Sequence, residues 1–167
     1  EYRNALGWAH QMLEKYATDI IPTENLISLA EVYLAMKDLP RGIRVVKYIN
    51  ASPSKKQSNA GRVALLEGRI ALLERDFPRA QAFLSSAAQL GDTRIRAKAL
   101  LLLADVYFEK HDYQTAAKYV LTAGKLDGGK YVHPITHLYA KLDGGKCRAA
   151  EGALAKLDIS AHERAQV

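Results

Sequence analysis

The sequence has few cysteines and no long apolar segment. Its 167 residues include a single cysteine, Cys147, so an internal disulfide and a multi-thiolate zinc site are both excluded. No run reaches the roughly 18 apolar residues that a membrane-spanning helix needs. The longest apolar run covers residues 99–104 and suits the buried stripe of a helix. We therefore expect no membrane insertion, while both the cytoplasm and the periplasm stay open as compartments.

Motifs for catalysis and cofactor binding are also missing. The chain has no Gly-rich cofactor turn and no Ser-His-Asp or Cys-His pairing at a meaningful spacing. Two Gly-Gly-Lys segments, at 128–130 and 144–146, lack the spacing of a phosphate-binding loop. His133 and His137 could face one ion, but Cys147 is the single further candidate, and zinc sites use three or four ligands. We expect no enzymatic activity, no cofactor and no metal site.

Strand signals are scarce, whereas helix signals run along the whole chain. Alternating Val, Ile and Thr residues, with Asn-Gly or Asp-Gly turns between them, do not occur. Pro40 and Pro78 each suit the first turn of a helix, where a missing N–H group is harmless. The sequence predicts an all-α fold of about nine helices, at residues 2–17, 23–37, 40–50, 58–74, 78–90, 93–110, 113–126, 133–142 and 146–157.

The chain repeats itself. One short pattern occurs three times, with spacings of 38 and 36 residues between its aspartates. It consists of an aspartate, a bulky apolar residue directly after it, and a small residue three positions after the bulky one. A fixed period of this length is the signature of a stacked helical array. The three copies are Asp38-Leu39-x-x-Gly42, Asp76-Phe77-x-x-Ala80 and Asp112-Tyr113-x-x-Ala116.

Together with residues on the preceding and following helices, these copies resemble the tetratricopeptide repeat family. That family has a Leu-Gly-x-x-Tyr run on its first helix, an aspartate-aromatic turn, and alanines on its second helix. The usual repeat of about 34 residues is shorter than the spacing here, and Ile49 stands where the late alanine of the first copy is expected. The resemblance rests on Leu29, Ala30, Tyr33, Asp38, Leu39 and Gly42; on Gly68, Ala71, Asp76, Phe77, Ala80 and Ala87; and on Leu103, Ala104, Tyr107, Asp112, Tyr113, Ala116 and Ala123.

The resemblance implies a right-handed superhelical solenoid of antiparallel helix pairs. First helices would line a concave groove, and second helices would cover the convex back. We expect one array over 1–167, cut from a longer chain because the first residue is Glu1 rather than Met. Its parts would be a second helix of a preceding repeat at 1–19, repeats at 23–53, 58–91 and 93–127, a degenerate repeat at 132–158 and a tail at 159–167.

Side chains of the first helices one turn from the small residues are expected to face this groove. Arg62, Arg69 and Lys98 would make it locally basic, and Leu72 and Phe108 would hold an apolar anchor of an acidic segment. A solvated charged face without a ligand is the alternative. The predicted groove residues are Arg62, Leu65, Arg69, Leu72, Lys98, Leu101, Asp105 and Phe108.

The resemblance and the missing motifs predict a non-catalytic scaffold or adaptor that binds a segment of another protein. The net charge of +6 favours an acidic partner. Other domains of the same parent chain are also expected partners. One alternative is an envelope-assembly or polysaccharide-export scaffold in the periplasm. A second alternative is a nucleic-acid-binding array using Arg41, Arg44 and Lys47, which the absence of interleaved aromatic residues disfavours.

Overall fold

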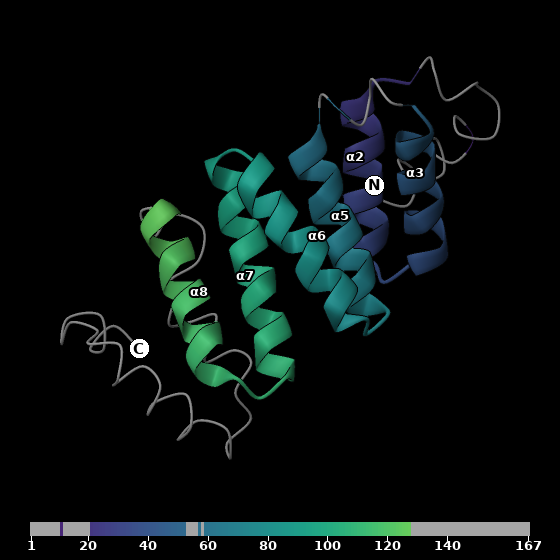
Figure 1. Ribbon diagram of the computed structural model, residues 1–167. Coiled ribbons are helices and arrows are strands. Elements are labelled where there is room, and N and C mark those ends of the chain that lie inside the picture. Colours follow the sequence, from purple (N-terminus) through teal and green to yellow (C-terminus); the bar gives the residue numbers. More distant parts are fainter. Residues whose placement is uncertain (1–10, 12–20, 53–56, 58, 128–167) are drawn as a thin grey trace.

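The computed structural model describes residues 11, 21–52, 57 and 59–127, and these form six α-helices with no strand among them (Figure 1). The all-α prediction is confirmed for this part of the chain. The helices expected at 2–17, 133–142 and 146–157 lie outside the described residues. The six helices are α2 (Thr23–Ala35), α3 (Leu39–Ala51), α5 (Ala60–Leu73), α6 (Phe77–Leu90), α7 (Thr93–Glu109) and α8 (Tyr113–Asp127).

Helices that follow each other in the sequence pack in pairs: α2 with α3, α5 with α6, and α7 with α8. Successive pairs meet where α3 contacts α5 and α6 contacts α7, and the first helices also touch, α2 with α5 and α5 with α7. A polar contact joins α3 to α5, because Asn50 Nδ2 donates to Glu67 Oε1 at 2.9 Å. The three pairs therefore lie in a row, in the order in which they occur along the chain (Figure 1).

The same turn joins the two helices of each pair. Its central residue, Lys37, Arg75 or His111, has a positive φ of 60° or 61°. This left-handed residue ends the first helix in a Schellman motif, which is why the helix predicted for 23–37 ends at Ala35. The N–H group of the next residue donates to the carbonyl oxygen five positions back, at 2.9 Å in all three copies: Asp38 to Tyr33, Asp76 to Ala71 and Asp112 to Tyr107.

The repeated aspartates then begin the second helices. In the first two pairs the side chain accepts a hydrogen bond from the backbone three residues on, Asp38 from Arg41 N at 3.3 Å and Asp76 from Arg79 N at 3.1 Å. In the third pair Asp112 accepts from Thr115 N at 3.1 Å. These bonds satisfy N–H groups that have no partner within the helix. The repeated aspartate therefore recurs because each turn needs a helix cap at the same position.

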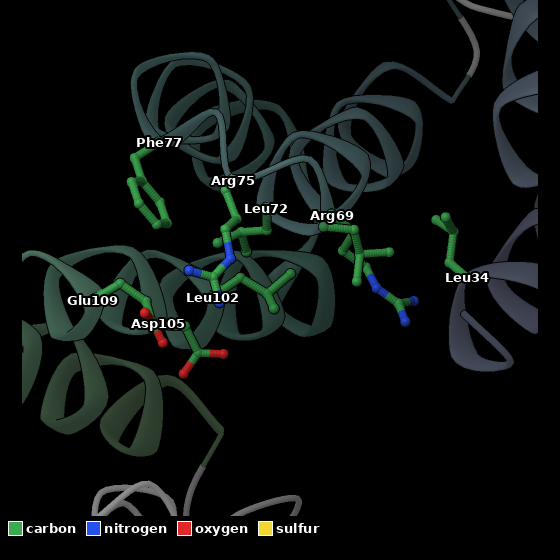
Figure 2. Close-up of a pocket in the computed structure, with 9 residues that line it drawn as sticks. Leu34, Arg69, Leu72, Arg75, Phe77, Leu102, Asp105 and Glu109 are labelled. Carbon is green, nitrogen blue, oxygen red and sulfur yellow. The ribbon is translucent and has the colours of Figure 1, made fainter. Parts of the chain in front are cut away.

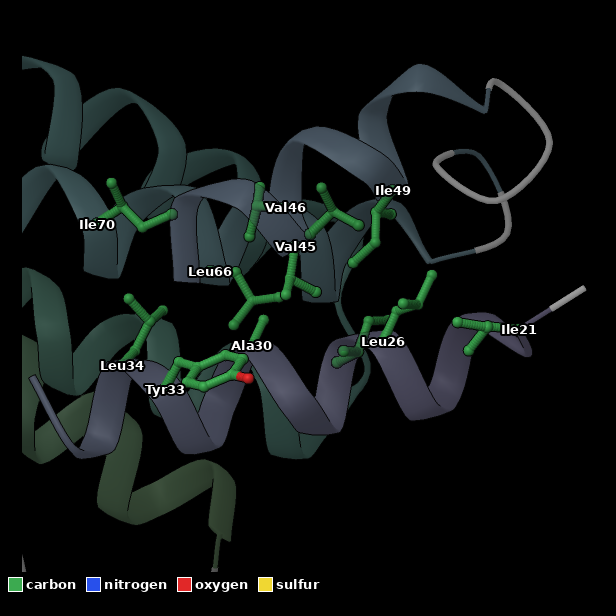
Figure 3. Close-up of a cluster of buried hydrophobic side chains, with 12 residues drawn as sticks. Ile21, Leu26, Ala30, Tyr33, Leu34, Val45, Val46, Ile49, Leu66 and Ile70 are labelled. Carbon is green, nitrogen blue, oxygen red and sulfur yellow. The ribbon is translucent and has the colours of Figure 1, made fainter. Parts of the chain in front are cut away.

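In the described part of the chain the core consists of three clusters of buried side chains, and each draws on more than one helix. In the first cluster, Leu26 and Ile27 of α2 pack with Val45 and Ile49 of α3, and Leu66 of α5 completes it (Figure 3). The second cluster likewise combines α5, α6 and α7, and the third joins α7 to α8. A helix pair thus buries part of its apolar surface against its neighbour, as the members of a stacked array do.

Small residues lie where the helices approach most closely, as the sequence predicted. A Cβ atom added to Gly68 of α5 would come within 2.5 Å of Leu84 Cδ2 on α6. One added to Gly42 of α3 would come within 2.8 Å of Leu34 Cδ2 on α2. Gly42 and Gly68 are therefore explained by packing, which outweighs the roughly 1 kcal/mol that glycine costs relative to alanine inside a helix.

Candidate functional site

A groove of about 280 Å³ opens between the first helices of the three pairs (Figure 2). It forms because α5 contacts both α2 and α7. The turn after α5 and the first residue of α6 close one end of it. Its lining residues are Leu34 of α2; Arg69, Leu72 and Leu73 of α5; Arg75 of the turn; Phe77 of α6; and Leu102, Asp105 and Glu109 of α7.

The groove combines apolar side chains with two pairs of charges. Arg69 and Arg75 carry its positive charge on α5 and the following turn, and Asp105 and Glu109 carry its negative charge on α7. The two carboxylates are four residues apart on one helix, so they lie on the same face. Leu73 is a large apolar side chain at the surface, 42% exposed. The groove can therefore offer an apolar contact flanked by charges of both signs.

Three of the eight predicted groove residues, Arg69, Leu72 and Asp105, line this groove. Two others belong to the core: Leu65 is 3% exposed, and Phe108 is 7% exposed and packs edge-to-face on Tyr113 with ring centroids 5.1 Å apart. The structure thus places these two side chains in helix packing. Whether any of the eight binds a ligand stays a prediction.

The remaining three predicted residues lie elsewhere. Lys98 is exposed on α7, and Leu101 is half-buried against the second and third clusters. Arg62 forms an ion pair with Glu24, which joins α5 to α2. This pair borders a second hollow of about 460 Å³ at the opposite end of α5. The basic patch expected from Arg62, Arg69 and Lys98 is therefore divided between separate places on the molecule.

Several groove residues were not predicted from the sequence, for a geometric reason. On α7 the groove is lined by Leu102, Asp105 and Glu109. The prediction shared Asp105 but named Leu101 and Phe108, each one position before the residue that lines the groove. One residue corresponds to a rotation of about 100° around the helix axis. The spacing of three and then four residues is the same for the predicted and the observed residues of α7, so it could not distinguish the two faces.

Arg75 and Phe77 also line the groove, although neither belongs to a first helix. Arg75 occupies the left-handed position of the turn, and Phe77 is the first residue of α6. No periodicity of the first helices could have included them. The bulky residue after each repeated aspartate was a visible signal, but it was interpreted as a packing residue alone.

No protein-family model, curated protein or solved structure matches the chain.

Within residues 21–52 and 59–127, no group of three or more His, Cys, Asp or Glu side chains is placed to hold a metal ion. His133, His137 and Cys147 lie outside the described residues. No helix in the described part is both long and apolar enough to cross a membrane.

The basic stripe on α3 is exposed at Arg41, Arg44 and Lys47. Arg41 is engaged locally, because its Nη1 atom lies 2.7 Å from Asp38 Oδ2 in the adjacent turn. In the sequence Lys55 and Lys56 follow this stripe, after the end of α3, and they lie outside the described residues. The described stripe therefore amounts to one helix face with one of its three cations already paired.

Proposed function

We propose that this chain is a non-catalytic module that binds a segment of another protein in the groove between α2, α5 and α7. The observation that carries the proposal is the exposed apolar surface of Leu73, set in a groove with charges of both signs. Apolar anchors supply much of the binding energy at protein interfaces, while flanking polar groups supply specificity. A groove spanning three helices also suits an extended or helical segment better than a compact small molecule.

The chemistry of the lining favours recognition over catalysis. Its side chains are leucines, one phenylalanine, two arginines and two carboxylates, so the usual nucleophiles Ser, Cys and Lys are not among them, and neither is His. Arginine stays protonated at neutral pH and therefore cannot act as a general base there. The same side chains are well suited to pairing with charges on a bound segment.

We further propose that the helix pairs form a right-handed solenoid of the tetratricopeptide type. The repeated turn geometry, the three capping aspartates and the small residues at helix crossings support this assignment. In such an array each unit depends on its neighbours for burial, and the first and second core clusters, which are shared between neighbouring pairs, agree with that. In this scheme α2, α5 and α7 are the first helices, and the groove lies on their side.

Panning a display library of random peptides on the 167-residue chain tests the proposed function. Enriched peptides should bind the parent chain and lose about tenfold or more in affinity for Leu73→Glu, because the new carboxylate must enter an apolar contact. Leu90→Glu is the matched control. Leu73 is the last residue of α5 and Leu90 the last residue of α6; both are exposed, and Leu90 lies outside the groove.

Either of two results would count against the groove. One is a library that yields no enriched family of peptides. The other is a set of enriched peptides whose affinity falls equally in both variants. Circular dichroism of the two variants should show the helicity of the parent chain, since each substitution is at an exposed helix end.

A further inference from the structure

Arg75 differs from its two structural equivalents. Lys37, Arg75 and His111 occupy the same left-handed position in three copies of one turn, with nearly identical φ values and hydrogen bonds. Of these three, Arg75 is the one that lines the groove. His111 instead contacts Tyr113, with Nδ1 and the hydroxyl oxygen 3.0 Å apart. The three side chains therefore have different surroundings although their backbones have the same conformation.

The turn directs the Arg75 side chain toward α7. A left-handed residue after a helix no longer follows the helical path, so its side chain is not restricted to the helix surface. In Figure 2 the side chain of Arg75 extends from the turn after α5 toward the helix that carries Leu102, Asp105 and Glu109. With Arg69 on α5, it provides planar guanidinium donors, which suit bidentate binding of a carboxylate.

The side of the groove formed by α7 favours positively charged groups. Asp105 and Glu109 place two negative charges on α7, so a purely acidic segment would meet repulsion there. A purely basic segment would meet the same penalty at Arg69 and Arg75. Although the chain as a whole has a net charge of +6, the described charges of this groove balance. Global charge therefore does not indicate the chemistry that the groove selects.

We propose that the groove selects a peptide segment with an acidic and a basic side chain on either side of an apolar residue, and that Arg75 is the residue that recognises the acidic one. This inference rests on the proposed function. The apolar residue would contact Leu73 and Leu102, and the basic side chain would lie at Asp105 and Glu109. The occupant differs from the acidic partner that composition alone suggests.

A panel of short blocked peptides tests the proposal by isothermal titration calorimetry. Each has a Leu-Leu core flanked by Glu then Lys, Lys then Glu, two Glu, two Lys or two Gln residues. One of the two mixed-charge peptides should bind most tightly. Arg75→Gly should weaken its binding on the order of tenfold, the scale of one charge-assisted hydrogen bond. Lys37→Gly and His111→Gly are matched controls, which make the same backbone change outside the groove and should leave Kd unchanged.

Several outcomes would overturn the inference. Equal binding of the mixed and the uncharged peptides would remove the role of charge, and tightest binding of the doubly acidic peptide would restore a simple acidic partner. Equal weakening in all three glycine variants would make the role of Arg75 structural. Failure of every peptide in the panel to bind would also overturn it.

The test separates this inference from the proposed function. Binding that is lost in Leu73→Glu and kept in Leu90→Glu, yet is independent of peptide charge, would leave the groove as the binding site and remove only the charge preference. Absence of groove-dependent peptides in the library experiment would remove both.

Discussion

Gly61 and Gly91 approach so closely that a Cβ atom on Gly61 would lie 2.6 Å from the Cα atom of Gly91. Gly61 is at the start of α5, and Gly91 follows the last residue of α6. The φ of Gly91 is −81°, which any residue can adopt, so this glycine is required for space and not for its backbone conformation. The contact fixes the distance between the start of α5 and the turn that leads to α7.

Alanine at Gly61 should therefore destabilise the fold by about 1–3 kcal/mol, because backbone atoms must move to make room. Gly42→Ala should cost clearly less, since the atom in its way is the tip of the Leu34 side chain and alanine also favours the helix. Urea denaturation measures both free energies of unfolding. Equal losses in the two variants would show that the Gly61 contact is looser than the structure indicates.

Substitution of the left-handed turn residues by glycine should stabilise the fold. Lys37, Arg75 and His111 each hold a left-handed conformation that costs a residue with a side chain about 1–2 kcal/mol. Part of the gain is lost because glycine makes the unfolded chain more flexible. We expect each glycine variant to have a free energy of unfolding about 0.5–1 kcal/mol higher than that of the parent chain. Lys47→Gly, at an exposed position inside α3, is the control and should lose about 1 kcal/mol.

For the turns, the outcome that matters is the contrast with this control. Losses in the turn variants as large as that of Lys47→Gly would mean that the positive φ values are wrong. The Arg75→Gly variant is of special interest, because it should combine higher stability with weaker peptide binding.

The cap at Asp112 should make stability depend on pH. The hydrogen bonds from the side chain and the backbone N–H of Thr115 lower the pKa of Asp112 below its usual value of 3.8. The folded state therefore favours the ionised carboxylate, and this stabilisation is present above about pH 4 and is lost as pH falls through the lower folded pKa. The stability difference between the parent chain and Asp112→Asn should shrink on acidification through this range.

Asp112→Ala serves as the reference for this experiment. It removes the cap altogether and should cost about 1 kcal/mol at neutral pH. Denaturant unfolding at a series of pH values gives both differences. A stability difference for Asp112→Asn that stays constant from neutral to acidic pH would contradict an ionised cap.

The ion pair between Glu24 of α2 and Arg62 of α5 should contribute little to the free energy of unfolding. Both side chains are partly or largely open to solvent, and exposed pairs contribute about 0.2–1 kcal/mol. A double-mutant cycle with Glu24→Gln and Arg62→Gln should give a coupling energy in this range that decreases with added salt. Because Arg62 lies at the second hollow, Arg62→Gln should leave peptide affinity unchanged. A loss of affinity would support the original groove prediction for this residue.

The sequence by itself determined the helices and turns. Pro40 and Pro78 lie in the first turns of α3 and α6 as predicted, and the repeated aspartates mark the starts of second helices. These features could be predicted because capping, proline placement and turn hydrogen bonds involve residues about five positions apart or fewer. The requirement for small residues at Gly42 and Gly68 was also readable, since a glycine inside a helix needs a packing reason.

The tertiary structure alone decided which side chains meet in the groove. The rotation of α7 about its axis exposes Leu102 and Glu109 to the groove and places Phe108 in the core. The approach of α7 to the turn after α5 brings Arg75 opposite the carboxylates. Both arrangements depend on how residues far apart in the sequence pack together. A rotation of α7 leaves its helical periodicity unchanged, keeps Asp105 at the groove and brings Leu102 and Glu109 there in place of Leu101 and Phe108.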